Sequence, residues 1–147
     1  MEVTIKISRT RKSSLPLPHY KSADAAGLDV VADLDQEIVL AQFARAAIPT
    51  GLCLEIPQGY EGQVRPRSGR AIDEGLTLIN SPGTVDADYR GELKILVVNL
   101  GDRPINIRPG DRIAQLVIAP VIRARIVEVE SLESSTRGEG GFGHTGR

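Results

Sequence analysis

An arginine-rich segment is the first candidate for chemistry in this sequence. Arg65, Arg67 and Arg70 surround Ser68 and Gly69 at the start of a short predicted helix. The first N–H groups of a helix lack intrahelical partners, and a guanidinium presents a planar fork of donors that fits a phosphate. The segment is therefore either a phosphate cradle or a solvated turn in which Ser68 caps the helix, and these residues alone favour neither.

A second segment, 80–91, places two carboxylates and a tyrosine between glycines. Asp86 and Asp88 lie on one face if the segment is extended, and Tyr89 follows them. A carboxylate here could serve as a general base or help to bind a metal. Turn aspartates that face water are more common, so the spacing alone favours a turn in which Asn80 makes a local hydrogen bond.

Two further segments carry polar groups in unusual settings. Gln115 is the one amide in an apolar stretch, where it must bond either a neighbouring strand or a ligand phosphate, and the first is slightly favoured. Residues 133–147 are glycine-rich, and Phe142 is their only apolar residue, beside Arg137 and His144. Such a tail is either a linker or a lid, because glycines let backbone N–H groups approach an anion closely.

The elements that must position these groups are predicted to be short strands. Fifteen glycines and nine prolines divide the chain into runs rich in Val, Ile and Leu, which indicates an all-β sandwich or barrel. Strands are expected over residues 1–8, 51–56, 92–100, 112–121 and 124–132. The pattern favours at most one short helix, over residues 68–74, and none in the alanine-rich stretch before Pro49.

Composition excludes several classes of protein. The chain has 147 residues, 41% of them hydrophobic and 25% charged, which is typical of one globular domain with an aliphatic core, since aromatics are only 3%. The net charge of -1 argues against stable nucleic-acid binding. No long apolar run or secretory signal is found, and Cys53 is the only cysteine, so we expect no membrane contact and a cytoplasmic or other reducing location. The lone Cys53 and the separated histidines predict packing and surface roles rather than a metal site.

The four segments, together with Ala26-Gly27-Leu28-Asp29-Val30, resemble in order and spacing the five motifs of the homotrimeric deoxyuridine triphosphatases (dUTP pyrophosphatases, dUTPases). The resemblance runs from about residue 23 to the C-terminus, and the ending Arg-Gly-x-Gly-Gly-Phe-Gly is its most specific part. It implies a β jelly roll, with a nucleotide-binding domain over residues 1–132 and a flexible lid over 133–147. It also implies a homotrimer whose subunits share three active sites.

The resemblance further implies an enzyme that hydrolyses dUTP to dUMP and pyrophosphate by water attack on the α-phosphorus. This reaction limits uracil incorporation into DNA and supplies dUMP for thymidylate synthesis. Asp86 matches the general base. Mg²⁺ is expected on the substrate phosphates and water without a direct protein ligand, with Asp29 contacting it through water. The matching phosphate-binding residues are Arg67, Ser68, Gly69, Gln115, Arg137, Gly143, His144 and Thr145. The matching uracil- and deoxyribose-binding residues are Asn80, Gly83, Thr84, Val85, Asp86, Tyr89 and Phe142.

Two alternatives remain beside this interpretation. A dCTP deaminase on the same fold would carry a Glu as the base of the third motif, where this chain has Asp86. A catalytically silent jelly roll would lack Asp86 or the tail, and both are present. One local departure is that Arg70, Asp73 and Glu74 lie at helical spacing in the second motif, which predicts surface ion pairs from Arg70 to both carboxylates.

Overall fold

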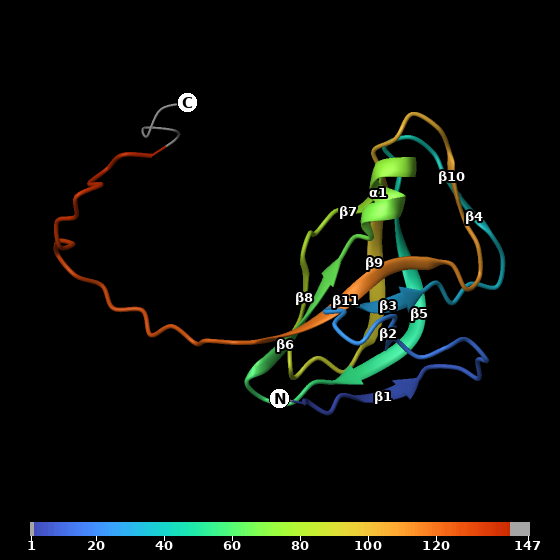
Figure 1. Cartoon of the computed structure of the whole chain (residues 1–147), viewed down its shortest axis with the longest axis horizontal. Helices are drawn as coiled ribbons and strands as arrows, with labels where there is room; N and C mark the ends of the chain where they lie inside the picture. Colours follow the sequence, from blue (N-terminus) through green and yellow to red (C-terminus); the bar gives the residue numbers. More distant parts are fainter. Residues whose placement is uncertain (1, 142–147) are drawn as a thin grey trace.

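Short β-strands dominate the computed structural model, which describes residues 2–141, and one short helix interrupts them in that range (Figure 1). The elements in chain order are β1 (Lys6–Arg9), β2 (His19–Tyr20), β3 (Leu28–Val31), β4 (Ile38–Leu40), β5 (Arg45–Glu55), β6 (Tyr60–Arg65), α1 (Ser68–Glu74), β7 (Leu76–Leu78), β8 (Gly83–Val85), β9 (Glu92–Asn99), β10 (Ile105–Ile107) and β11 (Arg112–Pro120). No helix among the described residues has the length and apolar character needed to cross a bilayer.

The strands form two larger sheets and one short pair, and all the pairings are antiparallel. The four-stranded sheet has the order β1-β5-β9-β7, the five-stranded sheet has the order β2-β3-β11-β6-β8, and β10 pairs with β4. One apolar cluster takes side chains from both larger sheets, including Ile48, Ile95, Ile113 and Leu116, so the sheets enclose a common core. The buried hydrophobic residues are all aliphatic, as the low aromatic content predicts. The jelly-roll prediction is confirmed.

Strand β9 shows how the sequence pattern becomes a half-buried strand. Leu93, Ile95 and Val97 are buried, whereas Lys94 and Leu96 between them are exposed. The strand lies between β5 and β7, so it is a central strand of its sheet. The described chain covers one of its two faces.

Helix α1 has the predicted bounds, but its cap differs from the prediction. Arg67 is the N-cap residue, in an extended conformation and without a side-chain capping bond, so Ser68 is already the first helical residue. The helix ends at Gly75, whose φ of 75° is left-handed and whose N–H bonds the carbonyls of Ala71 and Arg70. No residue of α1 is buried.

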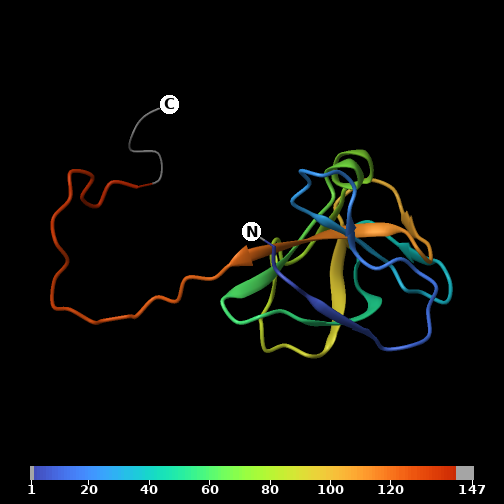
Figure 2. The same cartoon turned by 60° about the horizontal axis from the view of Figure 1, so that its bottom comes forward.

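The strand predicted over residues 124–132 does not form. From residue 121 the described chain has no regular structure and extends away from the two sheets (Figures 1 and 2). Ile122 is 95% exposed and Ile126 is 88% exposed. The alternating pattern is real, but no strand edge of the same chain lies beside it, and an unpaired strand is not stable in water.

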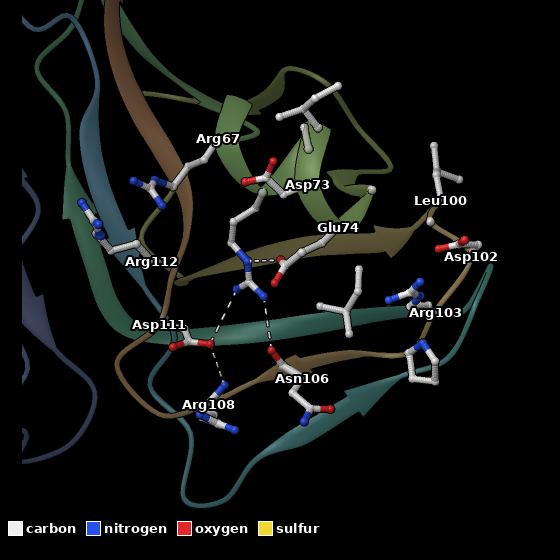
Figure 3. Close-up of a pocket in the computed structure, with 17 residues that line it drawn as sticks. Arg67, Asp73, Glu74, Leu100, Asp102, Arg103, Asn106, Arg108, Asp111 and Arg112 are labelled. Carbon is white, nitrogen blue, oxygen red and sulfur yellow. Dashed lines mark hydrogen bonds and ion pairs between the residues drawn. The ribbon is translucent and has the colours of Figure 1, made fainter.

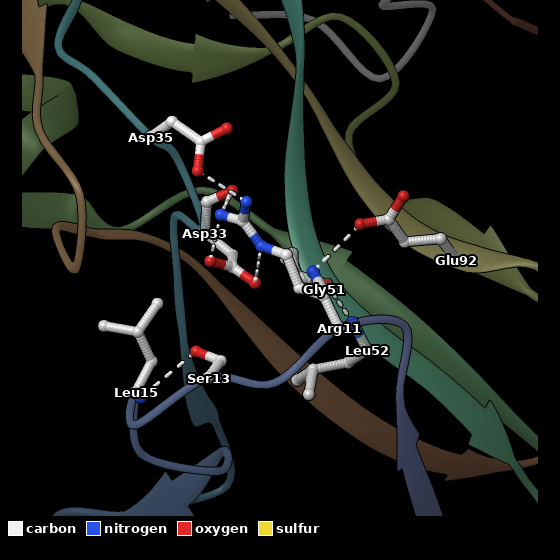
Figure 4. Close-up of polar contacts among 9 residues, drawn as sticks. Arg11, Ser13, Leu15, Asp33, Asp35, Gly51, Leu52 and Glu92 are labelled. Atoms are coloured by element: carbon white, nitrogen blue, oxygen red, sulfur yellow. Dashed lines mark hydrogen bonds and ion pairs between the residues drawn. The ribbon is translucent and has the colours of Figure 1, made fainter.

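A partly buried ion pair connects the N-terminal segment to the loop after β3. Arg11 donates to Asp33 Oδ1 at 2.6 Å and to Asp35 Oδ1 at 2.6 Å, and these carboxylates raise the pKa of the guanidinium (Figure 4). Asp33 packs against Gly51, where a Cβ would collide with its carboxylate. The Gly51 N–H donates to Glu92 at 2.9 Å, at the irregularity of the β5–β9 pairing (Figure 4). These contacts fix the start of β9, which follows directly after the segment 80–91.

Candidate active site

The first half of the site is a pocket of about 220 Å³ beside strand β8. Its lining includes Val64 and six residues that the resemblance assigns to uracil and deoxyribose. These six are Asn80, Gly83, Thr84, Val85, Asp86 and Tyr89. Strand β9 contributes Glu92, Leu93, Lys94 and Leu96.

Main-chain hydrogen-bonding groups are exposed in the pocket because β8 is an edge strand of its sheet. One edge of β8 pairs with β6, with Gly83 opposite Val64 and Val85 opposite Gly62. The other edge has no neighbouring strand in the sheet, so its N–H and C=O groups are available for a ligand. A Cβ at Gly83 would lie 2.9 Å from Asn80 Nδ2, so a glycine here lets the Asn80 amide lie against the strand.

Asp86 directly follows β8 and carries an exposed carboxylate. Its side chain forms no hydrogen bond or ion pair with residues 2–141, while its backbone carbonyl accepts from the Tyr89 N–H at 3.1 Å. A carboxylate without a cationic partner can accept a proton from water. The resemblance predicted this residue as the general base, and its placement in the pocket agrees with that role.

Tyr89 is held by its hydroxyl group. The hydroxyl donates to the Glu92 carbonyl at 3.0 Å. A Cβ at Gly91 would collide with the Tyr89 hydroxyl, so the absence of a side chain there lets the ring lie against the main chain. The ring is therefore fixed at the wall of the pocket, where a flat hydrophobic surface can support a sugar.

The second half of the site is centred on Asp29 in β3. Its Oδ1 accepts from Arg67 Nε at 3.0 Å, and its Oδ2 accepts from Arg112 at 3.0 Å. The Asp29 side chain is only 12% exposed. Arg67 and Arg112 lie side by side at one end of a groove of about 1130 Å³ (Figure 3). One carboxylate thus orients two guanidinium groups, which is an arrangement suited to an anion with several phosphates.

Gln115 connects three of the predicted motifs. It lies in β11, directly opposite Asp29 on one side and Arg65 on the other. Its amide donates to the Pro66 carbonyl at 2.9 Å, and its oxygen lies against Gly27, where a Cβ would collide with it. The structural hydrogen bond that the sequence favoured is therefore present, and it fixes the residue that precedes Arg67.

Ser68 and Gly69 lie in the first turn of α1. The first hydrogen bond of the helix runs from the Ala71 N–H to the Arg67 carbonyl at 3.0 Å, so the N–H groups of Ser68 and Gly69 have no partner within the helix. Nothing lies within 4 Å of a Cβ built on Gly69. An anion can therefore approach this backbone without obstruction.

The two halves do not meet within one chain. No residue lines both the pocket beside β8 and the groove that has Arg67 and Arg112 at one end. The described part of the tail, up to residue 141, lies away from both halves, and there Arg137 donates to the Gly140 carbonyl at 2.7 Å in an exposed local turn (Figure 2). The tail residues Phe142, Gly143, His144 and Thr145 are outside the described residues.

Sequence reasoning missed two residues of the site. Arg112 holds Asp29, and Glu92 contributes both a lining side chain and the carbonyl that holds Tyr89. A signal for Arg112 was available, since it precedes Gln115 by three residues in the segment already singled out. Nothing in the spacing of Glu92 distinguishes it from an ordinary strand residue.

The potential metal-ligating side chains among residues 2–141 limit how the protein could hold a divalent cation. Residues 2–141 contain no cluster of three or more His, Cys, Asp or Glu side chains that could form a cage. The carboxylate beside the phosphate-side arginines is Asp29, whose oxygens already accept from Arg67 and Arg112. A Mg²⁺ ion held by substrate phosphates and water fits this set, because Mg²⁺ usually keeps several waters and takes few protein ligands.

The comparison with protein-family models identifies residues 13–146 as a match to the dUTPase model. The chain belongs to the dUTPase family. Among curated relatives of this family, the deoxyuridine 5'-triphosphate nucleotidohydrolase of Syntrophotalea carbinolica is 56% identical over 98% of this chain and 97% of its own length. That of Caldanaerobacter subterraneus subsp. tengcongensis is 50% identical over 99% of both chains. The chain is therefore an enzyme that hydrolyses dUTP.

Solved dUTPase structures agree in fold. The dUTPase of Staphylococcus bacteriophage 80alpha, solved with dUPNHPP, superposes with a TM-score of 0.87 at 29% identity, over 98% of this chain and 99% of that one. A mutant dUTPase from phage phi11 of S. aureus superposes with a TM-score of 0.78 at 25% identity, over 89% of this chain and 99% of that one, and its description names a structural Mg(II) ion.

Proposed function

We propose that Asp86 is the general base for the hydrolysis of dUTP to dUMP and pyrophosphate. The observation that supports this most directly is that Asp86, with no partner among the described side chains, lines the same pocket as Asn80, the β8 backbone and Tyr89. The carboxylate takes a proton from a water molecule, whose oxygen forms a bond to the α-phosphorus. The bond from that phosphorus to the bridging oxygen breaks, and pyrophosphate leaves with the electron pair. A positioned carboxylate is a common general base for a proton transfer of this kind.

Uracil recognition is assigned to the free edge of β8 and the Asn80 amide. Main-chain donors and acceptors match the O4 and N3–H edge of uracil. Cytosine carries an amine in place of O4, which would leave a donor facing a donor, at a cost of about 1–3 kcal/mol. Tyr89, fixed against Gly91, supports the deoxyribose and leaves no room for a 2′-hydroxyl.

Triphosphate binding is assigned to the Asp29-centred half of the site. Arg67, the Ser68 and Gly69 backbone, and Gln115 offer the donors from the folded body. Arg137 and the tail residues Gly143, His144 and Thr145 complete the set when the tail closes. Mg²⁺ bound to the phosphates would supply charge neutralisation there, with Asp29 contacting its water shell.

We assign residues 1–132 to the nucleotide-binding domain, residues 133–147 to its lid, and the working form to a homotrimer with shared sites. The separation of the two lining sets among residues 2–141 supports this assignment, because shared sites would bring the two sets together from different copies. The exposed Ile122 and Ile126 support it too, since an apolar arm that leaves its own fold requires a surface on another copy. The product dUMP is then available for thymidylate synthesis.

The test is pyrophosphate release from dUTP, dCTP, dTTP and UTP in the presence of Mg²⁺, for the unmodified chain and an Asp86→Asn variant. We expect dUTP alone to react, and the variant to lose about 10²–10⁴-fold in kcat. Asp88→Asn is the matched control, because Asp88 is exposed on the same segment and lines neither the pocket nor the groove. Ammonia from dCTP would instead assign a deaminase, and an unchanged kcat in Asp86→Asn would remove Asp86 from the mechanism.

The trimer is tested by sedimentation equilibrium. We expect a mass close to three times 15.8 kDa. An Ile126→Asp variant should shift the population towards monomer, because it places a charge on the apolar arm. A monomer for the unmodified chain at assay concentration would contradict the shared-site proposal.

A further inference from the structure

Helix α1 carries the proposed phosphate-binding residues at its start, yet it lacks an apolar anchor. None of its residues is buried, and Ile72, its largest apolar residue, is 84% exposed. Helices in proteins are usually held in place by packing of an apolar face. The position of α1 over the sheets must therefore depend on polar contacts.

Two of these contacts lie at the ends of the helix. At its start, Arg67 is bonded to Asp29. At its end, the Gly75 carbonyl accepts from the Leu100 N–H at 2.9 Å, and a Cβ at Gly101 would collide with the backbone carbonyl of Glu74. Between these ends, one side chain of α1 reaches another part of the fold.

That side chain is Arg70, which is only 15% exposed. Its guanidinium donates to Glu74 within the helix, donates to the Asn106 carbonyl at 3.2 Å, and lies 3.6 Å from the Asp111 carboxylate. Asp111 is fixed in turn, because its carboxylate accepts from the Arg108 N–H at 3.0 Å (Figure 3). Of the two predicted ion pairs, Arg70–Glu74 therefore forms, whereas Arg70 contacts Asn106 of β10 and Asp111 of the following loop in place of Asp73.

The loop that contains Asp111 leads directly into the other phosphate-side residues. Residues 108–111 join β10 to β11, and β11 begins at Arg112 and carries Gln115. One guanidinium thus links helix α1, which carries Ser68 and Gly69, to β10 and to Asp111, the residue directly before Arg112. A planar fork of five donors can hold several acceptors in fixed directions, which an apolar side chain at this position could not do.

We propose that Arg70 is a positioning residue that holds helix α1 against the β10–β11 loop and so keeps the triphosphate-binding groups in place. The proposal rests on the proposed function, because it takes Arg67, Ser68 and Gly69 as phosphate ligands. Loss of the guanidinium leaves α1 free to move between its two ends. The binding of dUTP must then also order the helix, and this cost lowers the affinity of the enzyme for dUTP. Uracil binding at β8 is unaffected, because Arg70 does not line that pocket.

The experiment compares Arg70→Gln with Arg108→Gln. Arg108 lines the same groove and pairs with Glu37 at 2.8 Å, but its side chain makes no hydrogen bond or ion pair with α1. In Arg70→Gln we expect the KM for dUTP to rise about tenfold, a ratio that corresponds to about 1.4 kcal/mol, while kcat changes less and inhibition by deoxyuridine is unchanged. Amide exchange should accelerate in α1 and remain unchanged in β9. Arg70→Lys should recover part of the effect, since an ammonium can still bond one acceptor.

The outcomes separate this proposal from its alternatives. Arg70→Gln behaving like Arg108→Gln in both KM and α1 exchange would overturn the proposal. Faster exchange throughout α1, β9 and β11 would also overturn it, because Arg70 would then contribute only to global stability. If the unmodified chain fails to hydrolyse dUTP, the proposed function fails, and α1 exchange alone decides whether Arg70 holds the helix.

Discussion

Replacement of Asp29 by asparagine tests whether one carboxylate organises the phosphate side of the site. Asp29 is 12% exposed and accepts one charge-assisted bond from each of two arginines, both at 3.0 Å. Asparagine has the same shape but keeps one acceptor oxygen and turns two N–H donors towards the other guanidinium. A hydrogen bond to a charged group contributes about 1.5–3 kcal/mol. Because Arg67 and Arg112 are partly exposed, the lower part of that range applies, and we expect Asp29→Asn to lose about 2 kcal/mol of stability.

Thermal unfolding at fixed protein concentration measures this loss, since any subunit association makes the midpoint concentration-dependent. A loss of about 2 kcal/mol corresponds to a midpoint lowered by about 4–8 °C in a domain of this size. Asp35→Asn is the matched control, because Asp35 is 87% exposed and pairs with Arg11 alone. Exposed ion pairs contribute about 0–1 kcal/mol, so the control should shift the midpoint little. Equal shifts in the two variants would refute the reasoning, because Asp29 would then contribute no more than a surface carboxylate.

Two further predictions follow from close contacts elsewhere. Gly27→Ala should destabilise the chain by about 1–3 kcal/mol in thermal unfolding, because its new Cβ collides with Gln115, and the cost should shrink in a Gln115→Ala background. The hydrogen bond from Lys6 lowers the pKa of the Glu55 carboxyl below its ordinary value, so this pair stabilises β1 above that ordinary value and loses its contribution as the pH falls through the lowered pKa. The protection of the β1 amides, taken relative to the intrinsic exchange rate at each pH, should therefore fall at acid pH, and a Glu55→Gln variant, whose β1 amides should be less protected already at neutral pH, should lack this acid step.

The uracil side of the site was accessible from the sequence because its residues are close together along the chain. Asn80, Gly83, Asp86 and Tyr89 lie within one segment of turns and a three-residue strand. Local turn geometry is enough to gather them in one pocket. The phosphate side is different, because Arg112 and Asp29 are separated by 83 residues. The sequence predicts a strand over residues 112–121 but none around Asp29, and it does not show which strands pair, so the carboxylate that joins the two arginines could not be deduced.

The helix illustrates a second limit. Its bounds were predictable from local signals, since Gly75 supplies the left-handed residue that ends it. The choice of cap was wrong because a distant contact decides it. Arg67 stays extended and sends its side chain to Asp29, and this leaves Ser68 inside the first turn.

The strand predicted over residues 124–132 does not form for a third reason. Val127 and Val129 alternate with glutamates as a half-buried strand would, but both valines are exposed in the described chain. The pattern predicts pairing with a strand edge, and no strand among residues 2–141 pairs with this segment. Sequence periodicity identifies the alternation without identifying the edge that a strand here would need.

The place of β11 in its sheet also determines when the enzyme can be completed during synthesis. In the order β2-β3-β11-β6-β8, the last strand to be translated fills the middle position. Until β11 has been synthesised, β2–β3 and β6–β8 lack the strand that joins them, so their strand edges stay open to pairing with other chains. The strand that carries Gln115 then joins both strand pairs in one step. We therefore expect a chain that ends before residue 112 to have no partial activity. Such a chain lacks β11, which supplies both Gln115 of the phosphate side and the core residues Ile113 and Leu116.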